Sequence, residues 1–140
     1  MNRQDILDVI DRWERAFNER DLQAYAATYA DRAVMESPMA GSAAGRDGVT
    51  KATMALFSAF PDATITYEPA IIDETHAVIP AYATGTHGGT FMGIPASGRP
   101  FRVTLVFILE LKDGVIVRDR RVYDFTGFLV QLGILKTKPV

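Results

Sequence analysis

Residues 101–124 read FRVTLVFILELKDGVIVRDRRVYD. The first part, residues 101–111, is strongly apolar, and the Lys112-Asp113-Gly114 that follows is a typical turn signal between antiparallel strands. Residues 115–124 then form the returning arm. This stretch predicts a long β-hairpin, around which the remaining segments are interpreted.

The segments before the hairpin are also expected to be strands. Residues 64–72 are rich in Thr, Ile and Tyr, which favour strands, and residues 77–91 carry the next long strand. Gly85, Gly88 and Gly89 within this second segment predict bulges and sharp curvature. We therefore expect an antiparallel meander that curves strongly and encloses a cavity.

Helices are predicted before and after these strands. Near the N-terminus, four apolar residues recur at spacings of four, three and four: Ile6, Ile10, Trp13 and Phe17. This spacing predicts a helix with one buried face over residues 5–20. Asp21 can cap a second helix that reaches Tyr29, and a third is expected from residue 46 or 47 to about residue 60. Residues 125–135 also have helical spacing and can cover an open end of the sheet.

The order of elements defines the expected architecture. Helices first and an antiparallel meander afterwards are typical of an α+β fold. The 140 residues suit one domain, spanning residues 1–140. We expect N-terminal helices packed on a strongly curved antiparallel or mixed sheet, which together enclose a pocket for a hydrophobic small molecule.

Composition argues against several classes of partner. The chain has 15 Lys and Arg against 17 Asp and Glu, a net charge of −2, which provides no broad cationic field for nucleic acid. No apolar run approaches the roughly 20 residues of a membrane span, and no secretion signal is evident. We therefore expect a cytoplasmic protein that binds neither nucleic acid nor a membrane.

The residue types also limit the chemistry. The chain has no cysteine and only two histidines, His76 and His87, so thiol chemistry is excluded and a catalytic metal is not expected. Sequence motifs for nucleotide binding and for serine hydrolases do not occur. His76 follows a turn and is expected to be exposed. Acid–base chemistry without a cofactor, or binding alone, remains.

Five segments, spread over nearly the whole chain, resemble one protein family. They are Trp13 to Phe17 with Asn18-Glu-Arg-Asp21, Phe60-Pro-Asp62, residues 84–99 (TGTHGGTFMGIPASGR), Tyr123-Asp124, and Gln131-Leu-Gly133. Together they resemble the SnoaL-like polyketide cyclases of the NTF2-like superfamily, which also includes ketosteroid isomerase and limonene epoxide hydrolase. The resemblance implies a cone-shaped fold and an enzyme without metal or cofactor. It also implies an intramolecular aldol closure, with a polyketide ester as the best single expectation for the substrate.

Asp124 is the main candidate for catalysis. The resemblance implies that an aspartate at this position is the acid–base residue, and its neighbours Val122, Phe125 and Phe128 are apolar. Desolvation by such neighbours makes a carboxylate a stronger base, suited to removing a proton next to a carbonyl. The alternative is an aspartate that caps the C-terminal helix.

Glu110 and His87 are the other catalytic candidates. The family can place a histidine fourteen positions before the aspartate, and that position is Glu110 here. A bulge near Lys112-Asp113-Gly114 would put Glu110 and Asp124 on one face of the sheet, whereas a plain two-residue turn would not. His87 could polarise a substrate carbonyl or be hydrogen-bonded at a strand bend.

The run Arg118-Asp119-Arg120-Arg121 must alternate between the two faces of a strand. Either the pair at 118 and 120 or the pair at 119 and 121 faces inward. A salt-bridged outer face or dimer surface is one interpretation. The other is that Arg120, with Asp124 and a further carboxylate, imitates the Asp-Arg-Asp arrangement by which limonene epoxide hydrolase activates water.

Several residues are expected to contact substrate in such a cone, although their composition alone is typical of a core. They are Trp13, Phe17, Tyr29, Met35, Phe57, Arg120, Tyr123 and Phe128. A hydroxyl of Tyr29 or Tyr123 could donate to an enolate oxygen. Epoxide hydrolysis, double-bond isomerisation and non-catalytic transport of a hydrophobic ligand are the alternative functions. Apolar outward positions such as Val106 and Ile108 suggest a homodimer formed through the sheet.

Overall fold

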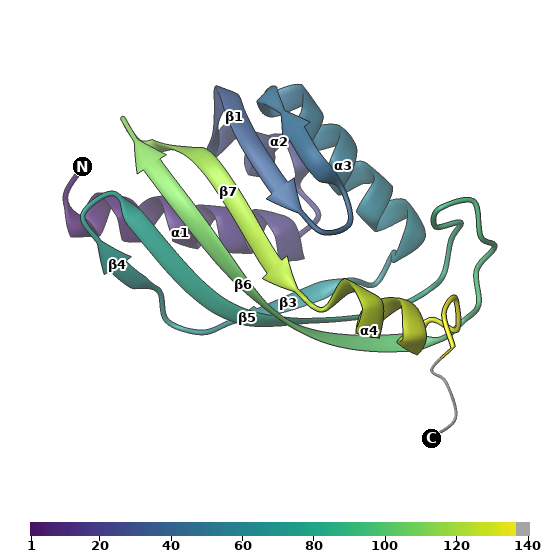
Figure 1. Cartoon of the computed structure of the whole chain (residues 1–140). Coiled ribbons are helices and arrows are strands. Elements are labelled where there is room, and N and C mark those ends of the chain that lie inside the picture. The colour runs from purple at the N-terminus through teal and green to yellow at the C-terminus, as the bar shows by residue number, and fades with distance from the viewer. Residues whose placement is uncertain (137–140) are drawn as a thin grey trace.

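The hairpin expected from residues 101–124 forms the centre of the sheet in a computed structural model that describes residues 1–136 (Figure 1). β6 (Pro100–Lys112) pairs antiparallel with β7 (Val115–Tyr123). Asp113 and Gly114 form the turn, with φ of 51° and 83°. This left-handed conformation matches the twist of a two-residue hairpin.

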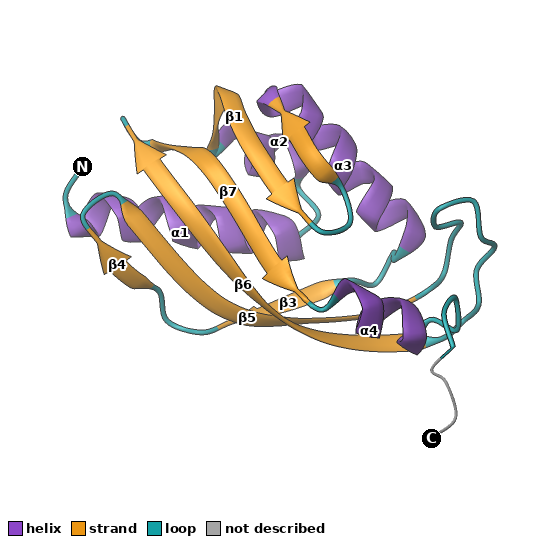
Figure 2. Ribbon diagram, viewed as in Figure 1, coloured by secondary structure: helices purple, strands orange, loops and turns teal. Residues whose placement is uncertain are grey.

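The other elements follow the predicted order, with helices before most of the sheet. They are α1 (Arg3–Asn18), α2 (Leu22–Ala27), β1 (Tyr29–Ser37), β2 (Gly41–Ala44), α3 (Gly45–Ala59), β3 (Thr64–Tyr67), β4 (Ile71–Asp73), β5 (His76–Thr86) and, after the hairpin, α4 (Phe125–Gln131). The first three helices cover one face of the curved sheet and α4 lies at one end (Figure 2). The α+β prediction is confirmed.

The strands form one mixed sheet in the order β2-β1-β7-β6-β5-β3, with β4 also paired to β5. All pairs are antiparallel except β1 with β7, which is parallel. The sequence predicts only a short extended piece at residues 34–36 and a loop at residues 41–45, and it assigns Tyr29 to a helix. It therefore misses the extent of β1 and the whole of β2. It also joined β3 and β4, which Glu68, Pro69 and Ala70 separate.

Two groups of buried side chains hold the layers together. The larger joins α1 to the sheet around Trp13, which is fully buried and meets the ring of Phe107 edge-on at 4.8 Å between ring centroids. The smaller group surrounds Phe60. Its ring packs against those of Phe101 and Phe128, at 5.1 Å and 5.4 Å between ring centroids. The second group fixes α4 against the end of the sheet.

No helix formed by residues 1–136 covers the convex face of the sheet (Figure 2). Val106 and Ile108 lie on this face and are half-buried, while their neighbours Leu105 and Phe107 point into the core. Among residues 1–136, no helix is long and apolar enough to cross a bilayer.

Candidate active site

An apolar cavity lies between α3, the end of β1 and the concave face of the sheet, with α4 at one end. The space between its walls is about 760 Å³ when the open mouth is included. Apolar side chains form most of the wall, among them Phe17, Leu56, Ile65, Phe101, Val103 and Phe128. Four polar residues interrupt it: Ser37, Thr53, Arg121 and Tyr123.

A bulge in β7 decides which residues reach this cavity. Leu111 pairs with Ile116, but Glu110 pairs with Arg118, so Val117 is an extra residue in β7. Ile116 is buried, and without the extra residue positions 118, 120 and 122 would share its face. Because of the bulge, the inward residues are instead Asp119 and those at positions 121 and 123.

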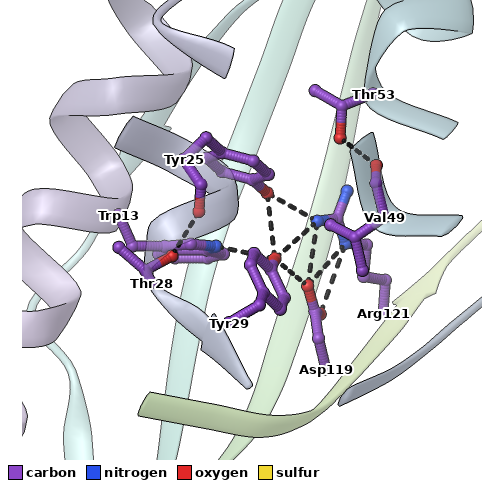
Figure 3. A network of polar contacts seen from close by, with 8 residues as sticks. All are labelled: Trp13, Tyr25, Thr28, Tyr29, Val49, Thr53, Asp119 and Arg121. Carbon is purple, nitrogen blue, oxygen red and sulfur yellow. Dashed lines mark hydrogen bonds and ion pairs between the residues drawn. The ribbon is translucent and has the colours of Figure 1, made fainter. Parts of the chain in front are cut away.

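Asp119 and Arg121 form a buried ion pair (Figure 3), of which Arg121 belongs to the cavity wall. Arg121 Nη2 donates to Asp119 Oδ2 at 2.9 Å, and Nε lies 3.3 Å from each carboxylate oxygen. The Asp119 side chain is fully buried, while that of Arg121 is 11% exposed. The guanidinium also lies over the Phe107 ring, 5.0 Å from its centre. Asp119 therefore holds the arginine from behind, on the side away from the cavity.

Two tyrosines and a tryptophan complete the hydrogen-bond network that holds Asp119 and Arg121 in place. Tyr29 donates to Asp119 Oδ2 at 2.6 Å and accepts from Trp13 Nε1 at 2.9 Å. The Tyr25 hydroxyl accepts from Arg121 Nη2 at 2.8 Å and lies 3.1 Å from the Tyr29 hydroxyl. Charged and polar groups buried in this way are stable only when their hydrogen bonds are satisfied. The network therefore fixes the position of the guanidinium closely.

The electrostatics keep this network in one protonation state. Burial raises the pKa of Tyr29 well above its usual value, and the charge of Asp119 adds to the increase. Burial also raises the pKa of Tyr25, although the charge of Arg121 opposes the change. For Arg121, burial alone would lower the pKa, but Asp119 raises it well above its usual value. The tyrosines therefore stay neutral and the arginine stays charged.

One terminal nitrogen of Arg121 is left for a ligand. Nη1 makes no hydrogen bond to any residue from 1 to 136, and Figure 3 shows it without a dashed line. Arg121 also belongs to the cavity wall. A guanidinium N–H in apolar surroundings is a strong donor to a carbonyl or enolate oxygen. The site can therefore bind an apolar molecule through one oxygen.

Tyr123 supplies a second polar group on the same wall. It is half-buried, and desolvation raises its pKa, while its hydrogen-bond partners Ser37 and Met39 act in the opposite direction. Thr53 differs because its hydroxyl is already donated to the carbonyl of Val49 at 2.8 Å. Tyr123 is thus a hydroxyl of the cavity wall that is not part of the Asp119 network.

Asp124 lies outside the cavity wall, contrary to the prediction that it occupies the pocket. It is exposed and forms the N-cap of α4, where Oδ1 accepts from the Gly127 amide at 2.9 Å. The helix-capping alternative describes this geometry. Its apolar neighbours were misleading because Phe125 and Phe128 belong to α4 and pack in the group around Phe60, so their burial does not place the aspartate in the cavity.

Glu110 and Arg120 lie on the outer face of the sheet, so their predicted roles in the pocket are wrong. The bulge does place Glu110 on the same face as position 120, but this is the convex face. Glu110 is 3.9 Å from His76, and Arg120 is 3.7 Å from Glu36. These are surface ion pairs, with every side chain at least 38% exposed. The Asp-Arg-Asp arrangement predicted around Arg120 therefore does not form.

His87 is fully buried beyond the end of β5, but it is not part of the cavity wall. Its Nδ1 accepts from the Ser97 amide at 3.2 Å and lies 2.9 Å from the Ser97 hydroxyl. The ring packs against Phe60 and Phe91. The structure thus places His87 as an anchor for the loop from 88 to 98, the strand-bend alternative.

The residues predicted to contact substrate lie in four different places. Four line the cavity: Phe17, Met35, Tyr123 and Phe128. Trp13 and Tyr29 lie behind the wall, in the network that supports Arg121. Phe57 packs against Phe17, 4.9 Å away between ring centroids. Arg120 is on the other face of the sheet.

The sequence-based prediction missed the central group of the site, although the alternation of residues 118–121 included it as one of two options. The signal that separates the options is the bulge at Val117, and no glycine or proline marks it. Tyr25 was assigned only to a helix. Its role depends on contact with Arg121, 96 positions further along the chain.

A curved mixed sheet closed by helices over an apolar cavity defines the cone of the NTF2-like proteins. The model of the family described as SnoaL-like polyketide cyclase matches residues 7–132. The chain therefore belongs to the SnoaL-like polyketide cyclase family, and a general polyketide cyclase-like role follows from it. No curated protein matches the chain.

Solved structures support the same assignment. IdmH from Streptomyces antibioticus, a candidate polyketide cyclase, is 32% identical with a TM-score of 0.77, covering 90% of this chain and 96% of IdmH. TsrD from Streptomyces laurentii is 26% identical with a TM-score of 0.84, covering 96% and 99%. AclR from Streptomyces galilaeus, a candidate hydroxylase, is 25% identical with a TM-score of 0.80, covering 94% and 87%.

Proposed function

We propose that the protein closes a ring in an apolar polycarbonyl compound by an intramolecular aldol reaction, with Arg121 holding the oxygen of the carbonyl that becomes the enolate. The observation that carries the proposal is the geometry of Arg121. Its Nε and Nη2 are occupied by Asp119 and Tyr25, while Nη1 remains for a ligand on the cavity wall.

The proposal rests on preorganisation. Negative charge develops on the carbonyl oxygen when the enolate forms, and a fixed donor stabilises this charge without rearranging. Asp119, Tyr25 and Phe107 already fix the guanidinium, and the apolar wall lowers the local dielectric. A donor held in this way is typically associated with about a 100- to 1,000-fold effect on rate.

The arginine acts as a charge and not as a base. Its pKa is raised well above the usual value by Asp119, so it keeps its protons. Among the described residues that line the cavity, none is a carboxylate or an imidazole. The α-proton therefore passes to water at the open mouth. Arg121 makes this proton more acidic, because it stabilises the negative charge on the oxygen of the neighbouring carbonyl.

The bonds balance without a cofactor. The enolate carbon attacks the second carbonyl carbon, forming one C–C bond and leaving an alkoxide. The alkoxide takes up a proton, which replaces the one lost from the α-carbon. Where the new ring can become aromatic, loss of water follows. No electrons are transferred to or from another molecule.

The test uses 1-(2-acetylphenyl)propan-2-one, an apolar dicarbonyl. Attack of its acetyl methyl carbon on the propanone carbonyl, followed by loss of water, gives 3-methyl-1-naphthol, whereas the opposite closure gives 4-methyl-2-naphthol. We expect the protein to accelerate appearance of the fluorescent naphthol by about 100-fold over buffer at neutral pH. The matched control is the same protein after heat denaturation. If the rate stays at the buffer value while the diketone binds, the protein is a carrier and the proposal is wrong.

The same assay separates this mechanism from one that uses Asp124 as the base. Asp124→Ser keeps a side chain that can cap α4 but removes the carboxylate. Because Asp124 caps a helix and does not reach the cavity wall, we expect turnover to stay within threefold of the wild type. Complete loss of turnover in a folded variant would restore the aspartate as the base.

Epoxide hydrolysis is less well supported by the site. An Asp-Arg-Asp arrangement needs two carboxylates beside the arginine. Within residues 1–136, Asp119 is the only carboxylate that forms an ion pair with Arg121. It also already accepts from Tyr29 at 2.6 Å, so it is not free to activate water.

A further inference from the structure

We infer that Tyr123 is a second catalytic residue of this cavity, which donates its hydroxyl proton to the alkoxide formed at the attacked carbonyl. The inference rests on the proposed function and deepens it, because it defines the substrate class. The substrate would carry two carbonyl oxygens, one at Arg121 and one at Tyr123, at the spacing of a 1,5-dicarbonyl.

The spacing of the two residues supports this pairing. Arg121 and Tyr123 are alternate residues of β7, and both line the cavity. Alternate residues of a strand are about 6.7 Å apart along the chain, and their side chains point to the same side. Two donors at this separation can reach the two oxygens of one folded 1,5-dicarbonyl compound. The carbon atoms that react are then held between them.

The surroundings of Tyr123 leave its own hydrogen available. Burial raises the pKa of Tyr123, although the nearby Ser37 and Met39 and the charge of Arg121 oppose the increase. The hydroxyl therefore keeps its hydrogen at neutral pH. Because the side chain also belongs to the cavity wall, this hydrogen can be donated to a molecule bound there.

Three other hydroxyls near the cavity are less available. Thr53 donates to the Val49 carbonyl at 2.8 Å. Tyr29 donates to Asp119 at 2.6 Å, and Tyr25 is fully buried beside it. Tyr123 is only half-buried, so water at the mouth can restore its proton after each turnover.

The step balances as a proton transfer. The enolate carbon bonds to the attacked carbonyl carbon, the C=O π electrons move to oxygen, and the Tyr123 proton passes to that oxygen. The product is a neutral alcohol and the tyrosine is left as a phenolate. Water then protonates the phenolate, and the overall proton count equals that lost from the α-carbon.

The first test compares Tyr123→Phe with the wild type in the naphthol assay. We expect kcat to fall by about 100-fold, as for loss of a general acid, while KM changes less than threefold because the ring remains. The control is Tyr82→Phe. Tyr82 lies on the outer face, where the guanidinium of Arg102 stacks on its ring at 3.9 Å, so its variant should keep full activity.

A second measurement excludes a purely structural role. Replacing Tyr123 with 3,5-difluorotyrosine keeps its shape but lowers the pH at which the hydroxyl ionises. A general acid is active in its protonated form, so activity is lost as pH rises through its pKa. We therefore expect the alkaline loss of kcat to begin at lower pH in the fluorinated protein, after subtraction of the uncatalysed rate.

The outcomes separate the two proposals. If the wild type does not accelerate naphthol formation, the proposed function fails, and this inference fails with it. If the wild type is active but Tyr123→Phe keeps its kcat, or if fluorination leaves the pH profile unchanged, only the role of Tyr123 is overturned. A loss of kcat in Tyr123→Phe, together with an alkaline loss of activity that begins at lower pH in the fluorinated protein, supports the role of Tyr123 as a general acid.

Discussion

Replacing Arg121 with lysine is expected to lower kcat for naphthol formation by about 100-fold, with the fold retained. Lysine keeps the positive charge, so Asp119 stays paired. A single ammonium cannot, however, hold Asp119 and Tyr25 and also present a fixed N–H to the cavity, as the planar guanidinium does. Initial rates at saturating diketone measure the loss.

The matched control is Arg118→Lys, on the opposite face of the same strand. Arg118 donates to Glu36 at the surface, 3.0 Å from Nε to Oε1. This variant should have the activity of the wild type. The double variant Asp119→Asn with Arg121→Gln removes both charges and leaves neither one buried alone. If it folds and still turns over the diketone at the wild-type rate, Arg121 is not the catalytic group.

Removing the partner of the arginine is expected to have the largest effect on stability. Asp119→Ala leaves the Arg121 charge in a buried site and also removes the acceptor of the Tyr29 hydroxyl. Breaking a buried ion pair on one side costs about 3–5 kcal/mol of folding free energy. Urea denaturation of the variant and the wild type measures the difference in the free energy of unfolding. The comparison holds when the unfolding free energy of both proteins has the same dependence on urea concentration.

A surface pair provides the control for this measurement. Glu36 contacts Arg118 at 2.9 Å, but both side chains are more than a third exposed. Glu36→Ala should therefore change the free energy of unfolding by less than about 1 kcal/mol. An Asp119→Ala protein that is as stable as the Glu36→Ala protein would show that the inner pair is hydrated and not fixed.

Local patterns in the sequence were sufficient for the fold class. The apolar alternation of residues 101–111, the Asp113-Gly114 turn and the spacing of Trp13 and Phe17 each depend on near neighbours, and each element formed as predicted. The full extent of β1, of which only residues 34–36 were predicted as extended, depends on a parallel pairing with β7 far along the chain. Its propensity alone does not reveal that pairing.

A shift of one residue in the register of β7 decides which residues form the functional site. Whether positions 118 and 120 or 119 and 121 face inward is set by the extra residue Val117, which reverses the alternation after Ile116. Bulges of this kind follow from tertiary packing and leave little trace in the sequence. The cavity and its apolar wall could therefore be predicted, but the identity of its charged group could not.

The prediction that Asp124 lies in the pocket was wrong for a similar reason, since the local sequence fits two different structures. An aspartate followed by Phe125 and Phe128 fits both a buried carboxylate and a helix N-cap, because the apolar residues serve the helix in either case. The hydrogen bond to Gly127 that separates the two interpretations is a local contact. The resemblance to the family favoured the other interpretation at this position.

The most direct test of the account is a crystal structure of the protein with 3-methyl-1-naphthol, the product of the proposed reaction. We expect the rings to lie in the cavity against Phe17 and Phe128, with the naphthol oxygen about 3 Å from Arg121 Nη1. A naphthol bound elsewhere, or bound in the cavity with its oxygen turned away from Arg121, would contradict it.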